Sequence, residues 1–187
     1  MANESDLDPP ARDEPIHLHT YDPAWPARFQ HEAGILTDAL GRYITGGVHH
    51  VGSTAIPGMD AKPIIDIMVG VLDLESSRPC IDLLAKLDYC YAPYRQDVMH
   101  WFCKPTPSRR THHLHLVPAG SQRFSEVLAF RDYLRIHPDA VRQYERLKRE
   151  LALRHPDDRD AYTDGKSAMV AAISADARRW LAAGGPG

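Results

Sequence analysis

The order of apolar and polar positions predicts an amphipathic helix near the start of the chain, over residues 24–40. The side chains with helical spacing are Trp25, Phe29, Ile35, Leu36 and Leu40. Asp22-Pro23 is typical of a helix start, and Gly46-Gly47 predicts a break before the next element. Residues 16–20 are expected to form a short strand or an extended lead-in.

The centre of the chain is rich in strand patterns. Residues 64–72 form a nearly continuous apolar run with many β-branched side chains, which predicts a strand buried on both faces. Residues 112–117 alternate between polar and apolar and are expected to form a strand that ends at Pro118-Ala119-Gly120. Shorter strands are predicted at 48–51, 89–92 and 99–104, the last two as candidates for pairing.

Most of the remaining chain reads as helix. Helices are predicted at residues 75–87, 121–135, 138–154 and 163–183. Pro138 falls in the first turn of its helix, where the missing N–H costs nothing. The acidic run at residues 157–160 is expected to be a solvated turn between helices.

This order of elements predicts an α+β fold, with a mixed β-sheet flanked by helices and a helical C-terminal third. At 187 residues the chain suits one domain, which we place at residues 16–183. Residues 1–15 are acidic and rich in proline, and we expect them to be a disordered tail.

Composition narrows the class of protein. A hydrophobic content of 43% and a charged content of 25% are ordinary for a water-soluble domain, and a net charge of -3 gives no strong signal for nucleic acid. Three cysteines, Cys80, Cys90 and Cys103, have no paired spacing, which favours reduced thiols. No apolar run reaches membrane length and no signal pattern opens the chain, so a cytoplasmic protein without membrane contact is expected.

A glycine-serine turn followed by an acid-bearing strand is the most informative local feature. Gly52-Ser53 is predicted to follow a strand, and a turn of this kind lets a phosphate approach backbone N–H groups. Asp66 interrupts the apolar run, where a carboxylate is costly without a charged partner. The alternatives are a tight structural turn and an acid satisfied by backbone donors or by Lys62.

Strand alternation predicts that three polar side chains converge. Asp66 and Met68 share one face of their strand, and His113 and His115 share one face of theirs. If the strands are neighbours, Asp66, His113 and His115 form a candidate ligand set for a divalent metal ion. The alternative is a half-buried strand whose polar face happens to carry histidines.

Five segments of the chain resemble the GrpB family, and together they span about residues 16–180. They are Gly52-Ser53, Lys62-Pro63-Ile64-Ile65-Asp66, His113-Leu114-His115-Leu116-Val117, Phe130-Arg131-Asp132-Tyr133-Leu134 and Tyr162-Thr163-Asp164-Gly165-Lys166. That family is similar to the nucleotidyltransferase superfamily, and it occurs alone or fused behind dephospho-CoA kinase. The resemblance implies a nucleotidyltransferase-like sheet.

The superfamily pattern is a Gly-Ser turn followed by two acids one residue apart, with a third acid from a later strand, and these acids hold two metal ions. Here Gly52-Ser53 matches the turn, Asp66 matches the first acid, and Met68 stands at the position of the second. Methionine does not bind Mg²⁺. Two interpretations follow: a different metal set built on Asp66, His113 and His115, or a domain that binds a nucleotide without transferring it.

The leading expectation is a metal-dependent enzyme that moves a nucleotidyl group, adenylyl in the first instance, from a nucleoside triphosphate to a small acceptor, or activates a carboxylate for ligation. The metal is Mg²⁺, Mn²⁺ or Zn²⁺, and Asp66 and His115 are the candidate catalytic residues. The candidate phosphate-binding residues are Gly52, Ser53, Thr54, Lys62, Lys104 and Lys166. The alternatives are a non-catalytic module that binds a nucleotide or CoA precursor, and an interaction domain.

Overall fold

The computed structural model describes residues 15–185 and has the α+β architecture expected from the sequence. Its sheet has five strands in the order β1-β2-β5-β4-β3. The strands are β1 (Ile44–Val51), β2 (Ile65–Val71), β3 (Cys90–Ala92), β4 (His100–Pro105) and β5 (Arg110–Pro118). Among the described strands β2 and β5 pair in parallel and the other pairs are antiparallel, so the sheet is mixed. The predicted pairing of β3 with β4 is confirmed.

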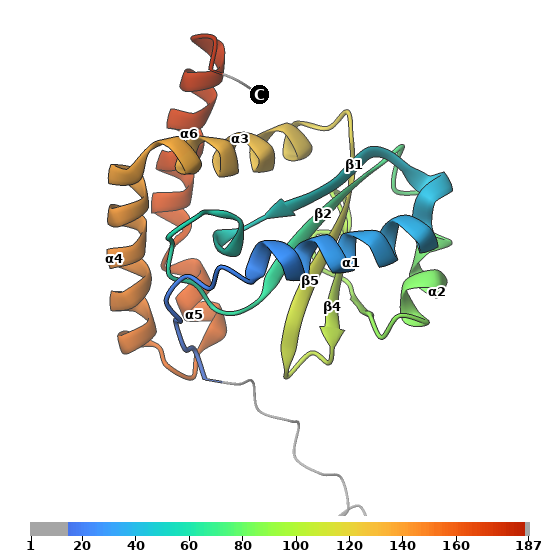
Figure 1. Cartoon of the computed structure of the whole chain (residues 1–187), viewed down its shortest axis with the longest axis horizontal. Coiled ribbons are helices and arrows are strands. Elements are labelled where there is room, and N and C mark those ends of the chain that lie inside the picture. Colours follow the sequence, from blue (N-terminus) through green and yellow to red (C-terminus); the bar gives the residue numbers. More distant parts are fainter. Residues whose placement is uncertain (1–14, 186–187) are drawn as a thin grey trace, which may run out of the picture.

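Within residues 15–185, six α-helices flank this sheet (Figure 1). They are α1 (Trp25–Leu40), α2 (Cys80–Ala85), α3 (Gln122–Ile136), α4 (Pro138–Arg154), α5 (Arg159–Asp164) and α6 (Ser167–Ala182). Figure 1 shows α1 running across the sheet, with α4 and α6 side by side at one end of the molecule. The C-terminal third is therefore helical, as predicted. None of the described helices is long and apolar enough to cross a membrane.

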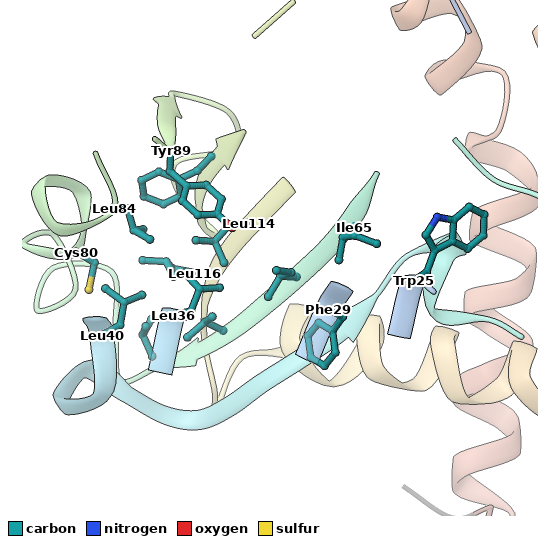
Figure 2. Packing of buried hydrophobic residues seen from close by; sticks show 14 of the residues in the cluster. Trp25, Phe29, Leu36, Leu40, Ile65, Cys80, Leu84, Tyr89, Leu114 and Leu116 are labelled. Carbon is teal, nitrogen blue, oxygen red and sulfur yellow. The ribbon is translucent and has the colours of Figure 1, made fainter. Parts of the chain in front are cut away.

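Helix α1 covers one face of the sheet with its predicted apolar stripe. Trp25, Phe29, Leu36 and Leu40 are buried, and they pack in one cluster with odd-numbered residues of β2 and even-numbered residues of β5 (Figure 2). Burying one such side chain contributes about 1.5–3 kcal/mol. Asp22 precedes the helix and accepts a hydrogen bond from the Ala24 N–H at 2.8 Å.

The opposite face of the sheet meets α3. Val51, Met68, Met99, Val117 and Phe124 form a second buried cluster there. Because side chains alternate along a strand, Asp66, Met68, His113 and His115 all belong to this face. Beyond the end of the sheet, Ile56, Met59, Leu134, Tyr144 and Ile173 pack together and join the turn after β1 to α3, α4 and α6.

Three boundaries differ from the sequence prediction. Strand β1 already begins at Ile44, and Gly46-Gly47 lie inside it at an irregularity of register instead of ending an element. A Cβ at Gly46 would lie 2.7 Å from the Cβ of Ala119, so the glycine permits a close approach. Helix α2 begins only at Cys80, because residues 74–79 form turns ahead of it.

The third difference concerns the last helix, which is divided into α5 and α6. Asp158, from the run predicted to be a solvated turn, is the N-cap of α5 and accepts a hydrogen bond from the Ala161 N–H at 2.9 Å. Gly165 separates the two helices, where a Cβ would lie 2.5 Å from Cδ2 of Leu151. Residues 16–20 are an extended lead-in with one bridge, His19 to Ala61. Residues 1–14 of the predicted tail lie outside the described residues.

Candidate functional site

The turn after β1 brings Gly52 directly against Asp66. Gly52 has φ +69° and ψ -172°, a conformation almost confined to glycine. A Cβ at this position would lie 2.2 Å from Oδ2 of Asp66. The turn can therefore lie over the Asp66 carboxylate only because residue 52 has no side chain.

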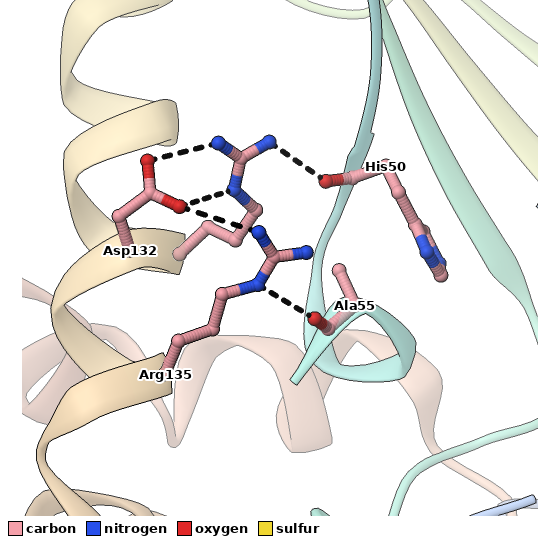
Figure 3. Close-up of polar contacts among 5 residues, drawn as sticks. His50, Ala55, Asp132 and Arg135 are labelled. Atoms are coloured by element: carbon pink, nitrogen blue, oxygen red, sulfur yellow. Dashed lines mark hydrogen bonds and ion pairs between the residues drawn. The ribbon is translucent and has the colours of Figure 1, made fainter. Parts of the chain in front are cut away.

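Hydrogen bonds from distant elements hold this turn in place. On α3, Arg131 donates from Nη1 to the His50 carbonyl at 3.2 Å, and Arg135 donates from Nε to the Ala55 carbonyl at 3.0 Å (Figure 3). Asp132 accepts from the Arg131 Nε at 2.7 Å, so the pair is an internal support for the turn and not a surface ion pair. The predicted phosphate contact Thr54 also has a structural partner, since its hydroxyl donates to the Ile64 carbonyl at 3.2 Å.

Asp66 and His113 form a hydrogen-bonded pair across the parallel strands β2 and β5. The Asp66 Oδ1 and the His113 Nδ1 are 2.9 Å apart, and the two side chains are 27% and 18% exposed. Burial alone would raise the pKa of Asp66, but the hydrogen bond from His113 and the nearby His115 and Lys62 outweigh it and hold the pKa below its usual value. Asp66 is therefore ionised at neutral pH.

The expected three-residue metal set is not assembled. Within residues 15–185, no group of three or more histidine, cysteine, aspartate or glutamate side chains is arranged to hold a metal ion. The sheet register explains this result: His113 lies beside Asp66, while His115 lies two residues further along, beside Met68. The His115 Nδ1 contacts Sδ of Met99 at 3.4 Å, and burial lowers the pKa of His115 to about 4. The donor set does not fit a resident metal centre.

A cavity of about 190 Å³, here called the lysine cavity, opens beside the turn and the Asp66–His113 pair. Its lining includes Ser53, Lys62, Lys148, Tyr162 and Lys166. The lysines come from three parts of the chain: the segment before β2, the middle of α4, and the residue that precedes α6. Two predicted phosphate contacts, Lys62 and Lys166, thus lie in one cavity with Ser53.

Lys148 is the member of this cavity that the sequence analysis missed. It is only 2% exposed, and its ammonium donates to the Ser53 hydroxyl at 3.3 Å and to the Asp60 carbonyl. Burial lowers the pKa of Lys148 to about 8. A signal was available, because Tyr144, Lys148 and Leu151 occupy the buried stripe of α4 at helical spacing. A lysine on an apolar stripe requires a polar partner in the interior.

Lys62 and Lys166 both contact the ring of Tyr162. The Lys166 Nζ lies 4.2 Å from the ring centroid and the Lys62 Nζ lies 5.1 Å from it. Burial, and then the like charge of Lys62, lowers the pKa of Lys166 to about 8. Both ammonium groups therefore lie against the buried Tyr162 ring, which also lines the cavity.

Asp66 also borders a second cavity of about 270 Å³, here called the apolar cavity. Val51, Met68, Val127 and Phe130 are among the residues that line it, together with His115. The predicted catalytic residue His115 therefore faces a different cavity from His113. Asp66 lies where the lysine cavity and the apolar cavity adjoin.

Lys104, a predicted phosphate contact, lies apart from Lys62 and Lys166. Lys104 pairs in the β4–β5 ladder with His112, on the face of the sheet that α1 covers. Its Nζ lies 2.9 Å from Oε1 of the buried Glu32, and 5.1 Å from the ring centroid of Tyr89. Lys104 neutralises a buried carboxylate of α1 on the opposite face from Asp66.

Comparisons with known proteins show the family of this chain. A family model described as GrpB protein matches residues 15–176. The chain is 41% identical over 169 residues to a UPF0157 protein of Pseudomonas aeruginosa, covering 87% of this chain and 68% of that protein. It is 30% identical over 178 residues to a dephospho-CoA kinase of Mycolicibacterium paratuberculosis, covering 79% of this chain and 42% of that one. The crystal structure of the conserved protein GrpB from Enterococcus faecalis has a TM-score of 0.82 and 34% identity, covering 88% of this chain and 99% of that one.

Proposed function

The chain belongs to the GrpB family, and from that premise we propose that its lysine cavity binds the phosphate groups of a nucleotide. The observation that carries this proposal is the convergence of Lys62, Lys148 and Lys166 on the turn that bears Ser53. Ammonium groups and the hydroxyl and N–H donors of a glycine-containing turn are the groups that recognise polyphosphates in proteins.

The charges around the cavity favour a ligand with several negative charges. Three lysines line the cavity, and among the described residues Asp66 is its one lining carboxylate, which is already hydrogen-bonded to His113. Burial lowers the pKa of Lys166, and the like charge of Lys62 lowers it further. A bound polyphosphate would remove this repulsion, whereas a neutral ligand would not.

The apolar cavity would hold the uncharged part of the same ligand. It adjoins the lysine cavity at Asp66, and Phe130 and Tyr144 offer it aromatic surface. A nucleobase is flat and apolar on its faces, so it suits such a lining. This division between the two cavities favours a nucleotide over inorganic polyphosphate.

The test is a thermal-unfolding screen of the full chain against ATP and dephospho-CoA, each with EDTA and each with Mn²⁺. A ligand at about 100 times its dissociation constant stabilises by roughly 2.7 kcal/mol, which raises the Tm of a domain of this size by about 5–10 °C. We expect a shift with EDTA, because the protein supplies the cations itself. Dephospho-CoA is included because one relative carries the name of its kinase.

Matched lysine variants decide where the ligand binds. Lys166→Gln removes a charged contact worth about 1.5–3 kcal/mol. It should therefore weaken ATP binding by roughly 10- to 100-fold. Lys86→Gln changes an exposed lysine outside the cavity and should leave the affinity unchanged. Equal affinities of the two variants, or no shift with either ligand, would contradict the proposal.

The Asp66–His113 pair favours a second candidate, nucleotidyl transfer to a small acceptor. A histidine oriented by a carboxylate can accept a proton from an attacking hydroxyl, and this one borders the phosphate cavity. The readout is pyrophosphate release from ATP in the presence of a bacterial metabolite extract. Pyrophosphate release that disappears in Asp66→Asn but persists in Lys86→Gln would support nucleotidyl transfer. In the thermal-unfolding screen, a Tm shift that needs Mn²⁺ would show that the metal arrives with the nucleotide.

A further inference from the structure

The wall of the apolar cavity includes an arginine, Arg123 of α3. The side chain is partly buried, and burial is the main cause that lowers its pKa. The charge of Arg123 contributes to the lowered pKa of His115, so the guanidinium lies near an imidazole that lines the same cavity. Because arginine stays protonated in proteins, this wall presents a cation that is partly removed from water.

The Arg123 guanidinium is available to a ligand. Within residues 15–185 it forms no hydrogen bond and no ion pair, and none of its nitrogen atoms is sealed in the interior without a partner. Its charged neighbours include Arg95, which repels it, and Glu126, which attracts it. The Glu126 Oε1 already accepts hydrogen bonds from Gln122 at 2.7 Å and from Arg178 at 2.9 Å. Arg123 therefore has donors to spare.

The other charges of the cavity favour a neutral partner for Arg123. Asp66 and Glu126 place two carboxylates in the same lining, and they would repel a carboxylate or phosphate of a ligand. The walls around them are largely apolar, with Val127 and Phe130 among the lining residues. The group that suits this cavity is therefore a flat, mostly apolar ring whose edge carries neutral hydrogen-bond acceptors.

We infer that Arg123 makes the apolar cavity selective for guanine over adenine. The fork of an arginine donates two hydrogen bonds to adjacent acceptors, and O6 and N7 of guanine are such a pair. Adenine has an amino donor in place of O6, and its edge matches asparagine or glutamine, neither of which is in the described lining. The inference rests on the proposed function, because it takes the apolar cavity as the site of the base. It replaces the adenylyl group expected from the sequence with a guanylyl group.

The experiment compares GTP, ATP and 7-deaza-GTP by calorimetric titration of the full chain. The three nucleotides carry the same triphosphate, so the lysine cavity contributes equally and the ratio of affinities reports on the base. We expect GTP to bind roughly 10- to 100-fold more tightly than ATP. 7-Deaza-GTP has a C–H group in place of N7 and should bind about 10-fold more weakly than GTP, because one of the two hydrogen bonds is lost.

Arginine variants assign the preference to one side chain. Arg123→Met keeps a long side chain without donors, so GTP and 7-deaza-GTP should bind it equally. Arg123→Gln should reverse the preference toward ATP, because a glutamine amide matches the edge of adenine. Arg146→Gln changes an exposed arginine of α4 outside the cavity and should keep the wild-type ratio. Since each ratio is measured on one protein, a loss of stability does not imitate the result.

The outcomes separate this inference from the proposed function. Equal affinities for GTP and ATP that both depend on Lys166 would overturn the guanine preference and leave nucleotide binding intact. A preference for GTP that persists in Arg123→Met would also overturn the inference. If no triphosphate binds, guanosine is titrated instead. Guanosine binding that is lost in Arg123→Met and kept in Lys166→Gln would support the base site and contradict the phosphate site, and no guanosine binding would overturn both.

Discussion

At the scale of single residues, the close contact between Gly52 and Asp66 restricts which side chain position 52 can carry. The backbone of Gly52 lies so close to the Asp66 carboxylate that any side chain would overlap it. That carboxylate is in turn oriented by His113 from the neighbouring strand. Met68, where the superfamily pattern has a second acid, is instead part of a buried apolar cluster. The site therefore holds Asp66 in a defined position.

Replacing Gly52 by alanine tests this contact. Gly52→Ala combines backbone strain with overlap on Asp66 and should destabilise the fold by about 2–4 kcal/mol, as measured by urea unfolding. Gly58→Ala is the matched control, because Gly58 has φ +78° but open space at the Cβ position, and it should cost only about 1–2 kcal/mol. Equal losses in the two variants would show that the approach to Asp66 is unimportant.

The lowered pKa of His115 predicts that the protein loses stability in acid. Its pKa is lowered to about 4 in the folded state, against about 6.5 for an unperturbed histidine, so the unfolded chain binds more protons between these values. Stability should fall as the pH drops from 6.5 to 4, with His115 contributing about 2–3 kcal/mol of the loss. Urea unfolding at pH 7 and pH 4.5 should show a smaller loss in His115→Gln than in His31→Gln, an exposed control. The same loss in both variants would contradict the assignment.

At the scale of elements, α3 positions the site although no catalytic candidate lies on it. Arg131 and Arg135 hold the backbone of the turn after β1, and Phe124 packs on the second face of the sheet. The helix begins at a conventional cap, in which the Ser121 hydroxyl accepts a hydrogen bond from the Phe124 N–H at 3.2 Å. Fraying of this helix would release the turn that carries Ser53.

Removing the cap tests how much this hydrogen bond stabilises the fold. Ser121→Ala should cost about 1 kcal/mol of stability in chemical denaturation, because the N-cap hydrogen bond is lost. Ser125→Ala changes an exposed serine inside the same helix and should be neutral or slightly stabilising, since alanine has the higher helix propensity. A Ser121→Ala protein as stable as Ser125→Ala would show that the cap contributes nothing.

At the scale of the whole molecule, the lysine cavity exists only because the helical third folds back over the end of the sheet. Lys148 and Lys166 are separated from Ser53 by more than half of the chain, yet all three border one volume. Burial there lowers the pKa of both lysines to about 8. The ammonium groups of Lys148 and Lys166 therefore lose their protons near pH 8, within the range of ordinary binding and unfolding experiments.

This arrangement predicts opposite pH trends for stability and for phosphate affinity. Between pH 8 and about 10.4 the unfolded chain holds more protons than the folded one, so Lys148 and Lys166 should make the free protein more stable as the pH rises. ATP affinity should fall by roughly 10-fold or more over the same range, because the ammonium charges are lost. Urea unfolding and ATP titration at pH 7.5 and 9.5 measure the two trends, and parallel changes would contradict the prediction.

Local patterns determined much of the fold. The apolar spacing in α1, the β-branched run of β2 and the alternation in β5 predicted these elements and the face shared by Asp66 and His113, because periodicity is a property of the local backbone. Glycines were harder to interpret, since Gly46-Gly47 lie within a strand and Gly165 divides a helix for reasons of packing. Such close approaches depend on residues far along the chain.

The sequence by itself determined the family, the α+β class and the identity of the turn and its acid, since these depend on residue types at short spacing. Only the tertiary structure decided which cations surround that acid. In the fold, Lys104 lies on the opposite face of the sheet beside Glu32, and Lys148 of α4 lines the cavity. His115 lies beside Met68 and not beside Asp66. The physical reason is that strand register and helix docking are set by long-range burial, which a local pattern does not encode.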